Sequence, residues 1–363
     1  MSLESASAAR LHAVEVSGDE SAVEGPLRGY HHETYVFSLP GDAGSRWKCR
    51  EPRAGLLWFD RRCFSSEEQL LSSLSGRISG IPDIVEIDGI RLQRFIEGRT
   101  LGSLYMSGSP VPVTLLQQIT DVFGQLICVT PETLLVKRRC KDEDRPEGGD
   151  SNGFLERLVS FTEEHVYLKN LQEFEVLFAD LGIDADSFKK LRKHVSGLKE
   201  RPFGLLHADL HRENFIVDSG NRLWTIDWEL AMVGDPLYDL ATHLYLMRYP
   251  RWQERMVVQR WSSVVEALRP GASNGLEHDL PLLLDYKKAQ SVFTDVIRVA
   301  LSQDAGAESY RRRLHHAGLK LRDVLAAAAG PLGLEAVPTS EGIASALTRR
   351  RRSHMDGDGV GAR

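Results

Sequence analysis

The sequence predicts an α+β fold with two lobes, a small β-rich N-terminal lobe and a larger, mainly helical C-terminal lobe. Three observations support this prediction. The 363 residues are enough for two lobes, each with its own hydrophobic core. Short runs rich in β-branched and aromatic residues dominate residues 22–98. Beyond residue 98, apolar residues mostly recur at helical spacing.

The N-terminal lobe, residues 22–98, is predicted to contain two strand pairs and one helix. The expected strands are residues 34–39, 46–50, 84–87 and 90–95. The Pro- and Gly-containing stretch 40–44 forms the first turn, and Asp88-Gly89 forms the second. A helix starts at residues 65–68, where Ser and Glu precede a run of leucines. Residues 1–21 are expected to be a loose tail.

The C-terminal lobe, residues 99–335, is predicted to be mostly helical. The expected helices are residues 115–129, 154–168, 171–181, 187–198, 237–247, 253–268, 280–301 and 309–329. The polar, Gly-rich stretch 137–153 reads as a loop. Two short apolar runs flank a turn at residues 218–221. Residues 336–363, basic and then Gly-rich, are expected to be a disordered tail.

Composition and charge exclude several classes of protein. No apolar run approaches the roughly 20 residues that span a bilayer, and the N-terminus is no secretory signal. The four cysteines lack metal-site spacing, which indicates reduced thiols and a cytoplasmic location. Residues 241–363 carry a net charge of +5 and residues 1–240 one of −11. The Arg runs in the basic part read as solvated surface, so neither a nucleic-acid nor a membrane partner is expected.

The most informative segment is residues 207–217, HADLHRENFIV, followed by Ile226-Asp227-Trp228-Glu229. Asp209, Asn214 and Asp227 supply one carboxylate to receive a hydroxyl proton and two oxygen donors for Mg²⁺. These parts suffice to transfer a phosphoryl group from a nucleotide to an alcohol, and protein kinases place them in a similar order. The alternative is that Asp209 caps a helix or forms a salt bridge, and that Asn214 and Asp227 belong to turns.

Two blocks of the sequence resemble the aminoglycoside phosphotransferase family between about residues 22 and 329. The first block is similar to the family's His-Gly-Asp-Leu-His-Pro-Gly-Asn and departs from it at Ala208, Arg212 and Glu213. Residues 225–241 look like the family's metal-binding block. Across the two blocks, this chain has the family's residue at His207, Asp209, Leu210, His211, Asn214, Asp227, Trp228, Glu229, Gly234, Asp235, Pro236, Asp239 and Leu240.

The resemblance implies a two-lobed, protein-kinase-like fold with a catalytic loop at residues 205–217 and a metal-binding segment at 223–241. Asp209 is then the catalytic base, and Asn214 and Asp227 are the Mg²⁺ ligands. It also implies that Asp235 caps a helix and that Asp239 steadies the catalytic loop. His207 is expected to brace the backbone, and His211 to support the inner face of the loop.

The nucleotide, ATP or GTP, is expected to bind the N-terminal lobe. Its phosphates need a cation that pairs with a helix carboxylate, for which Arg50 fits best and Lys48 remains the alternative. Glu67 is favoured as the paired carboxylate over Glu68. The remaining expected contacts are weaker: a covering loop with Gly29 and Thr34, and a hinge where the backbone of Arg94 and Ile96 holds the base.

The acceptor is predicted to be a small hydroxylated molecule. An antibiotic is the first hypothesis, and the basic C-terminal part favours a nucleoside- or macrolide-type compound over a polycationic aminoglycoside. The second hypothesis is a metabolite such as choline, homoserine or a sugar. The third is a non-catalytic, kinase-like binding protein.

Overall fold

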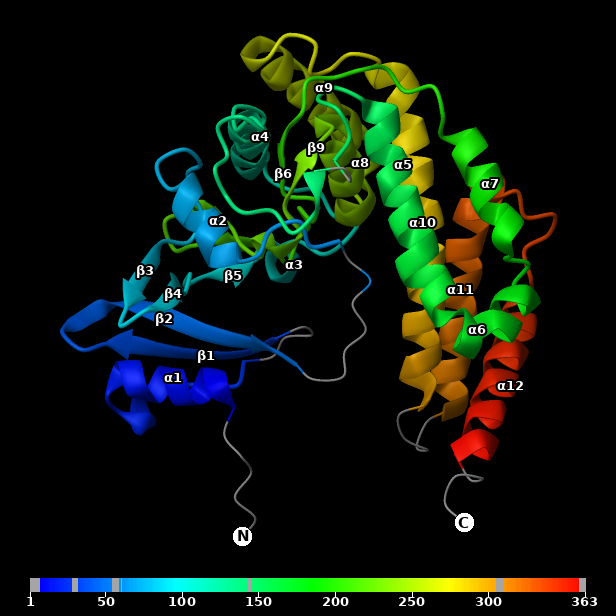
Figure 1. Cartoon of the computed structure of the whole chain (residues 1–363), viewed down its shortest axis with the longest axis horizontal. Coiled ribbons are helices and arrows are strands. Elements are labelled where there is room, and N and C mark those ends of the chain that lie inside the picture. Colours follow the sequence, from blue (N-terminus) through cyan, green and yellow to red (C-terminus); the bar gives the residue numbers. More distant parts are fainter. Residues whose placement is uncertain are drawn as a thin grey trace. The chain divides into compact units, whose positions relative to one another are not determined.

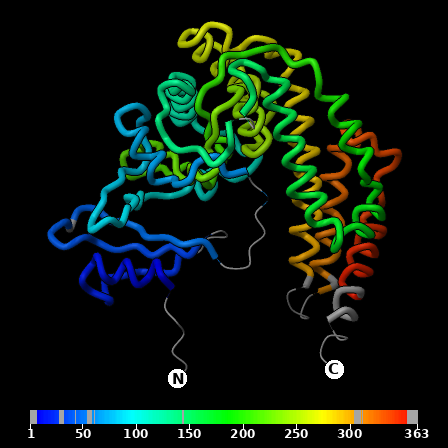
Figure 2. Tube along the Cα trace, in the orientation of Figure 1, coloured from blue at the N-terminus to red at the C-terminus, as the bar shows by residue number. Residues whose placement is uncertain are grey.

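The computed structural model describes residues 7–27, 32–53, 59, 61–142, 145–304 and 310–358 (Figures 1 and 2). The chain forms two compact units, one of residues 1–141 with 203–272 and one of residues 142–202 with 273–363. The predicted boundary after residue 98 lies within the first unit. Strand β5 (Arg99–Thr100) follows this boundary and pairs with β7 (Phe215–Val217).

A four-stranded antiparallel sheet forms the β-rich part of the first unit. The order is β1-β2-β4-β3, with β1 at His32–Leu39, β2 at Asp42–Pro52, β3 at Ile84–Ile87 and β4 at Ile90–Arg94. These are the strands that the sequence predicts, and β2 extends further at both ends. Both hairpin turns use a glycine with positive φ, Gly41 and Gly89, a conformation that costs glycine little.

Helix α1 (Ala8–Ser17) covers one face of this sheet (Figure 1). The expected tail at residues 1–21 was therefore wrong for this stretch. Ala9 and Ala13 are buried in a cluster made of residues Tyr35, Phe37, Trp47, Cys49 and Leu92. The buried stripe of the helix is made of small side chains, which contact the sheet closely but give only a weak apolar pattern in the sequence.

Helix α2 (Glu67–Leu74) lies beside the sheet in the first unit, as the sequence predicts. Ser66 caps it by accepting a hydrogen bond from the backbone N–H of Gln69 at 3.2 Å. Leu70, Leu71 and Leu74 are buried, and Glu67 is buried on the same face of the helix, because it precedes them by three, four and seven positions.

The rest of the first unit is a helical body with short strands that carry the predicted loops. Its helices are α3 (Leu101–Leu104), α4 (Val113–Ile127), η4 (Trp228–Leu230), α8 (Pro236–Met247) and α9 (Arg251–Leu268). Its strands are β5, β6 (Gly204–Leu206), β7, β8 (Leu223–Thr225) and β9 (Met232–Gly234). Sheet β5-β7-β8 and the pair β6-β9 are antiparallel. The predicted catalytic loop connects β6 to β7, and the predicted metal segment follows β8.

The second unit is a helical bundle. It contains α5 (Ser151–Phe161), η3 (Thr162–Leu168), α6 (Lys169–Asp180), α7 (Ala185–His194), α10 (Leu276–Asp304), α11 (Tyr310–Leu332) and α12 (Ser340–Asp358). Helices α10, α11 and α12 run antiparallel in succession (Figures 1 and 2). Tyr167, Phe178, Phe188 and Phe293 contact one another in its core, with ring centroids 4.5–6.2 Å apart. Segment η3 is π-helical, so the helix predicted for residues 154–168 changes its winding there.

Helix α12 corrects the predicted disordered tail at residues 336–363. Ile343, Ala346 and Leu347 are buried, at helical spacing, and α12 packs against α11 and α6. The guanidinium of Arg350 lies 4.7 Å from the centroid of the Phe174 ring. In the sequence, Arg350 suggests an exposed charge, although its side chain is buried in the structure. For this reason the sequence did not predict the helix.

None of the helices within the described ranges combines the length and the apolar character that a membrane span requires.

The ion pair between Arg201 and Asp279 in the second unit yields a stability prediction. Both side chains are fully buried, and the guanidinium Nη1 lies 2.5 Å from Asp279 Oδ2. Arg201→Met removes the guanidinium group from a fully buried carboxylate and should lower the free energy of unfolding by about 3–5 kcal/mol. Arg201→Met combined with Asp279→Leu should recover most of the loss. Urea unfolding of both variants measures this, and equal losses would contradict the explanation.

Candidate functional site

The structure brings Asp209 and Asn214 into direct contact within the loop between β6 and β7. The Asn214 side-chain amide Nδ2 donates to the Asp209 backbone oxygen at 3.0 Å and to Asp209 Oδ2 at 2.9 Å. The Asn214 backbone oxygen accepts from the N–H of Ile226 at 3.0 Å, which places the residue before Asp227 beside the loop. The three predicted catalytic and metal-binding residues therefore lie in one region, although thirteen positions separate Asn214 from Asp227.

Asp227 is held in a strained conformation and an acidic environment. Its φ is +64°, in the left-handed region that residues with a side chain rarely adopt. Burial, and then the charges of Glu229 and Asp209, raise the pKa of its carboxyl group, while Arg50 and Lys48 oppose them. Its Oδ1 is buried and has no hydrogen-bond partner among the described residues. A bound cation would relieve both the repulsion and the unpaired oxygen.

The residues around Asp227 fit Mg²⁺ as the cation. No group of three His, Cys, Asp or Glu side chains in the described part of the chain is placed to hold a metal alone. A site with one carboxylate and one amide oxygen suits Mg²⁺, which keeps several waters and binds substrate phosphates in addition to one or two protein ligands. Asn214 is compatible with this role because its contacts to Asp209 use the amide nitrogen and leave the oxygen for other partners.

Helix α8 supports the N-terminal end of the catalytic loop. Asp239 Oδ2 accepts from the backbone N–H of His207 at 3.0 Å, and Asp239 Oδ1 accepts from that of Ala208 at 2.7 Å. Asp235 caps the same helix by accepting from the N–H of Leu237 at 2.9 Å. Ala208 has a φ of +65°, which explains why glycine suits this position in the block that the sequence resembles.

The two histidines of the loop occupy different environments. His207 is fully buried, its Nε2 lies 3.1 Å from the Ile226 oxygen, and its ring centroid lies 4.7 Å from that of Trp228. Burial lowers the pKa of His207 to about 4. His211 Nε2 lies 3.3 Å from Asp209 Oδ2. Burial alone would lower the pKa of His211, but its hydrogen bond to Asp209 and the surrounding carboxylates raise it.

A buried carboxylate, Glu67, connects the β-rich part to the metal segment. Arg50 on β2 forms an ion pair with Glu67, and its Nε lies 3.6 Å from Glu68 Oε1. The other Glu67 oxygen, Oε1, accepts a hydrogen bond from the backbone N–H of Trp228 at 3.0 Å. The structure thus pairs the cation and the carboxylate that the sequence favours, and it places both next to the residue that follows Asp227.

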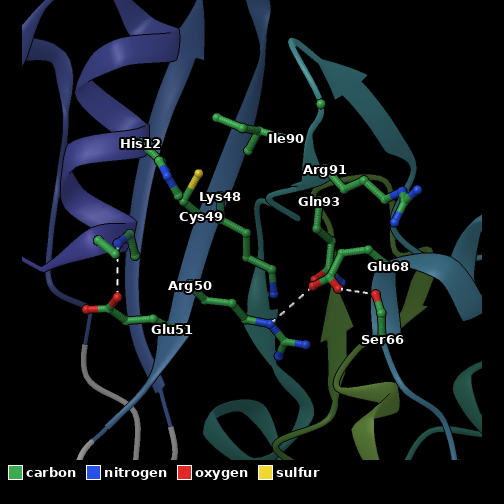
Figure 3. Close-up of a pocket in the computed structure, with 13 residues that line it drawn as sticks. His12, Lys48, Cys49, Arg50, Glu51, Ser66, Glu68, Ile90, Arg91 and Gln93 are labelled. Atoms are coloured by element: carbon green, nitrogen blue, oxygen red, sulfur yellow. Dashed lines mark hydrogen bonds and ion pairs between the residues drawn. The ribbon is translucent and has the colours of Figure 1, made fainter.

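Lys48 lines a cavity of about 350 Å³ beside Arg50 and Glu68, at the place where β2 and β4 part (Figure 3). Burial, followed by the nearby charge of Arg50, lowers the pKa of the Lys48 ammonium to about 8. Arg50 already has carboxylate partners, whereas no salt bridge to Lys48 is present among the described residues. Both cations therefore remain candidates for contacting phosphates, with Arg50 in the paired geometry.

The other predicted nucleotide contacts are only partly described. Thr34 lies opposite Arg50 in the β1–β2 ladder, and Gly29 lies outside the described residues. The backbone N–H of Arg94 donates to the Asp83 oxygen at 2.8 Å. Ile96 lies two residues after β4, in the segment that joins the sheet to β5. Arg94 is thus held in the sheet, where it pairs with Trp47 of β2.

Several site residues are absent from the sequence-based prediction. The Glu229 side chain is 6% exposed. Its Oε1 lies 2.7 Å from Arg62 Nη2, and its Oε2 lies 3.6 Å from His32 Nε2. Gln93 is 1% exposed, lines the same cavity as Lys48, and neither atom of its amide has a partner among the described residues. The position of Glu229, two residues after Asp227, was a signal from which its place in the site could have been predicted. Nothing in the local sequence distinguishes Arg62, His32 and Gln93 from ordinary strand or loop residues.

Two buried histidines, His207 in the loop and His243 on α8, yield a prediction of pH-dependent stability. The pKa values of His207 and His243 are lowered to about 4 by burial, against 6.5 in the unfolded chain. Between these pH values the unfolded state binds more protons, so stability falls as the pH falls, by about 1.4 kcal/mol per pH unit for each histidine.

The variant His243→Gln retains a donor for the Leu210 oxygen and removes one titrating group. Urea unfolding between pH 7 and pH 4 should give a shallower slope for this variant than for the wild type. An unchanged slope would show that His243 does not carry its share of the acid sensitivity.

Comparison with known proteins shows the family and the fold of the chain. A family model described as "Phosphotransferase enzyme family" matches residues 29–272, more than half of the chain. The structure is similar to a choline/ethanolamine kinase family protein from Mesorhizobium loti, with 13% identity and a TM-score of 0.53 over 94% of this chain and 98% of that chain. It is also similar to the choline kinase LicA from Streptococcus pneumoniae, with 16% identity and a TM-score of 0.51 over 88% and 98% of the two chains.

A third similar structure is the macrolide 2′-phosphotransferase MphH from Brachybacterium faecium, with 16% identity, a TM-score of 0.49, and coverage of 88% and 94%. The fold predicted from the sequence, a small antiparallel-sheet lobe with a mostly helical remainder of the protein-kinase-like type, is confirmed. The matched region contains the Asp209, Asn214 and Asp227 constellation and the Arg50–Glu67 pair. The chain belongs to the phosphotransferase enzyme family.

Proposed function

We propose that the protein transfers the γ-phosphoryl group of ATP or GTP to a hydroxyl group of a small molecule, with Mg²⁺. The observation that supports this most directly is the contact of Asn214 with Asp209 and, through Ile226, with the segment of Asp227. It joins a base and two oxygen donors for a metal in one region, which is the arrangement that phosphoryl transfer to an alcohol needs.

Asp209 would orient the acceptor hydroxyl and take its proton. Its Oδ2 accepts from Asn214 and lies near His211 Nε2, so these contacts leave Oδ1 for the hydroxyl. The hydroxyl oxygen forms a bond to the γ-phosphorus while the bond to the β,γ-bridging oxygen breaks, and the nucleoside diphosphate leaves. Asn214 and Asp227 would hold Mg²⁺, which neutralises phosphate charge when it is bound.

The β-rich part would bind the nucleotide. Arg50, oriented by Glu67, is proposed to contact the phosphates, and Lys48 is the alternative or a second contact. Gly29 and, from strand β1, Thr34 would cover the phosphates, and the backbone of Arg94 and Ile96 would hold the base. A cation fixed by a helix carboxylate gives the phosphates a preorganised partner.

Two classes of acceptor are supported by different observations. The net charge of +5 over residues 241–363 disfavours a polycationic aminoglycoside and favours a neutral or acidic antibiotic of the nucleoside or macrolide type. The likeness to choline kinases favours a metabolite such as choline, homoserine or a sugar. A non-catalytic binding protein is disfavoured because Asp209, Asn214 and Asp227 are all present.

The substitution Asp209→Asn should lower turnover by about 10²–10⁴ and retain nucleotide binding, because a positioned base contributes to the chemical step. Asp227→Ala should in addition abolish the Mg²⁺-dependent part of nucleotide affinity. Calorimetric titration with ATP, with and without Mg²⁺, and product formation measure the two effects. Asp218→Asn, in the turn after β7, is the matched control and should change neither quantity. Full activity of Asp209→Asn would show that this carboxylate is not the base.

A screen over hydroxylated antibiotics and metabolites, with ATP and GTP in parallel, tests the proposed function. Mass spectrometry should find a product heavier by one phosphoryl group. Expression in a sensitive bacterium should raise resistance to the same compound if the acceptor is an antibiotic. Nucleotide binding without any phosphorylated product across the screen would support the non-catalytic alternative.

A further inference from the structure

Arg212, inside the catalytic loop, donates three hydrogen bonds from one guanidinium group. Its Nε donates to the carbonyl oxygen of Met247 at 3.0 Å, Nη1 to that of Tyr105 at 2.8 Å, and Nη2 to that of Ser109 at 2.8 Å. The residue is only 5% exposed. An arginine that is buried at this depth and donates to three backbone oxygens is a structural residue and not a solvated surface charge.

The three acceptors belong to different segments. Met247 is the last residue of α8, Tyr105 is the C-cap of α3, and Ser109 lies in the turn before α4. Carbonyl groups at helix ends lack a partner within the helix, so they need an external donor. The planar guanidinium is the side chain that can serve several oxygens at fixed angles, and a lysine ammonium on a flexible stem cannot reproduce this geometry.

The backbone of the loop is held on the same side. The Arg212 carbonyl oxygen accepts from the N–H of Gly102 at 3.0 Å. His243 Nδ1 lies 2.8 Å from the Leu210 oxygen, and His243 Nε2 lies 3.0 Å from the Tyr249 hydroxyl. The Arg212 guanidinium lies 5.8 Å from the centroid of the Tyr249 ring. Leu210 and Arg212, the two neighbours of His211, are therefore both anchored to α8 and the segment that follows it.

The sequence that this loop resembles has proline at the position of Arg212, and proline restricts the backbone covalently. In this chain the restriction has a different physical origin, since three charge-assisted hydrogen bonds hold the side chain and a backbone bond to Gly102 holds the main chain. Two contacts therefore hold the loop on either side of Asp209 in the sequence. Asp239 binds the amides of His207 and Ala208 before it, and the Arg212 side chain is held after it.

We propose that Arg212 is a positioning residue: it holds the catalytic loop in the conformation in which Asp209, supported by His211 and Asn214, faces the acceptor hydroxyl. The inference rests on the proposed function of Asp209. Arg212 acts through the loop and not on the reactants, so its loss should affect turnover more than nucleotide affinity. A misplacement of about 1 Å at a reacting group can cost about 100-fold in rate.

Turnover is measured as Mg²⁺-dependent hydrolysis of ATP, with water as acceptor, so that no identified substrate is needed. Arg212→Lys should lower kcat about tenfold and Arg212→Ala about 100-fold, with little change in the Kd for ATP. Guanidinium chloride below denaturing concentrations should restore part of the kcat of Arg212→Ala. Arg77→Lys is the matched control, because Arg77 donates to the Thr133 oxygen and hydroxyl away from the site, and should leave kcat unchanged.

A second measurement is independent of activity. Hydrogen–deuterium exchange of the amides in residues 207–214 should be faster in Arg212→Ala than in the wild type, while exchange in β8 stays the same. Unchanged kcat in the folded variants, an equal loss of ATP affinity and kcat, or unchanged exchange in the loop would each overturn the proposal. Absence of a phosphorylated product in the acceptor screen, with faster loop exchange in Arg212→Ala, would count against the proposed function and leave the positioning role supported.

Discussion

The organisation of the candidate site depends on the buried carboxylate of Glu67, whose side chain is 1% exposed. One of its oxygens pairs with Arg50 on β2, and the other accepts from the backbone of Trp228. A carboxylate without partners would be costly at this depth, so both contacts are needed for the charge to remain buried. This single side chain therefore keeps the strand that carries the cations in register with the segment that carries Asp227.

Helix α8 provides the second constraint. It is buried over almost its whole length. Two of its buried polar residues, Asp239 and His243, each bind a backbone group of the catalytic loop. Because α8 is packed on most sides, it is a rigid support. The hydrogen bonds from α8 therefore restrain the loop. Arg212 extends the same anchoring to the carbonyl end of the helix.

The charges in the site are arranged for a ligand that brings both cation and anion. Burial and the nearby carboxylates of Glu229 and Asp209 raise the pKa of Asp227, and burial lowers the pKa of Lys48. The Asp227 carboxylate and the Lys48 ammonium are therefore charged at a cost in the protein alone. A divalent cation would compensate the carboxylates, and phosphate oxygens would compensate the ammonium. This electrostatic strain supports the proposed binding of a metal–nucleotide complex.

The sequence by itself determined the strands of the small sheet, most helices and the family resemblance. It also singled out Asp209, Asn214 and Asp227, which the structure brings into one region. These features are local: they depend on periodicity, capping residues and spacings of a few positions. The pairing of Arg50 with Glu67 was also favoured correctly, from strand alternation and helix spacing.

Only the tertiary structure decided the helical state of α1 and α12, whose buried faces are made of small residues or of an arginine stem. It alone showed the contacts of Arg212 with Tyr105 and of Glu229 with Arg62, and that the amide of Gln93 has no partner within the described part of the chain. The physical reason is that these properties arise from groups far apart in the chain. No local pattern records which distant carbonyl or carboxylate a side chain will meet once the core has packed.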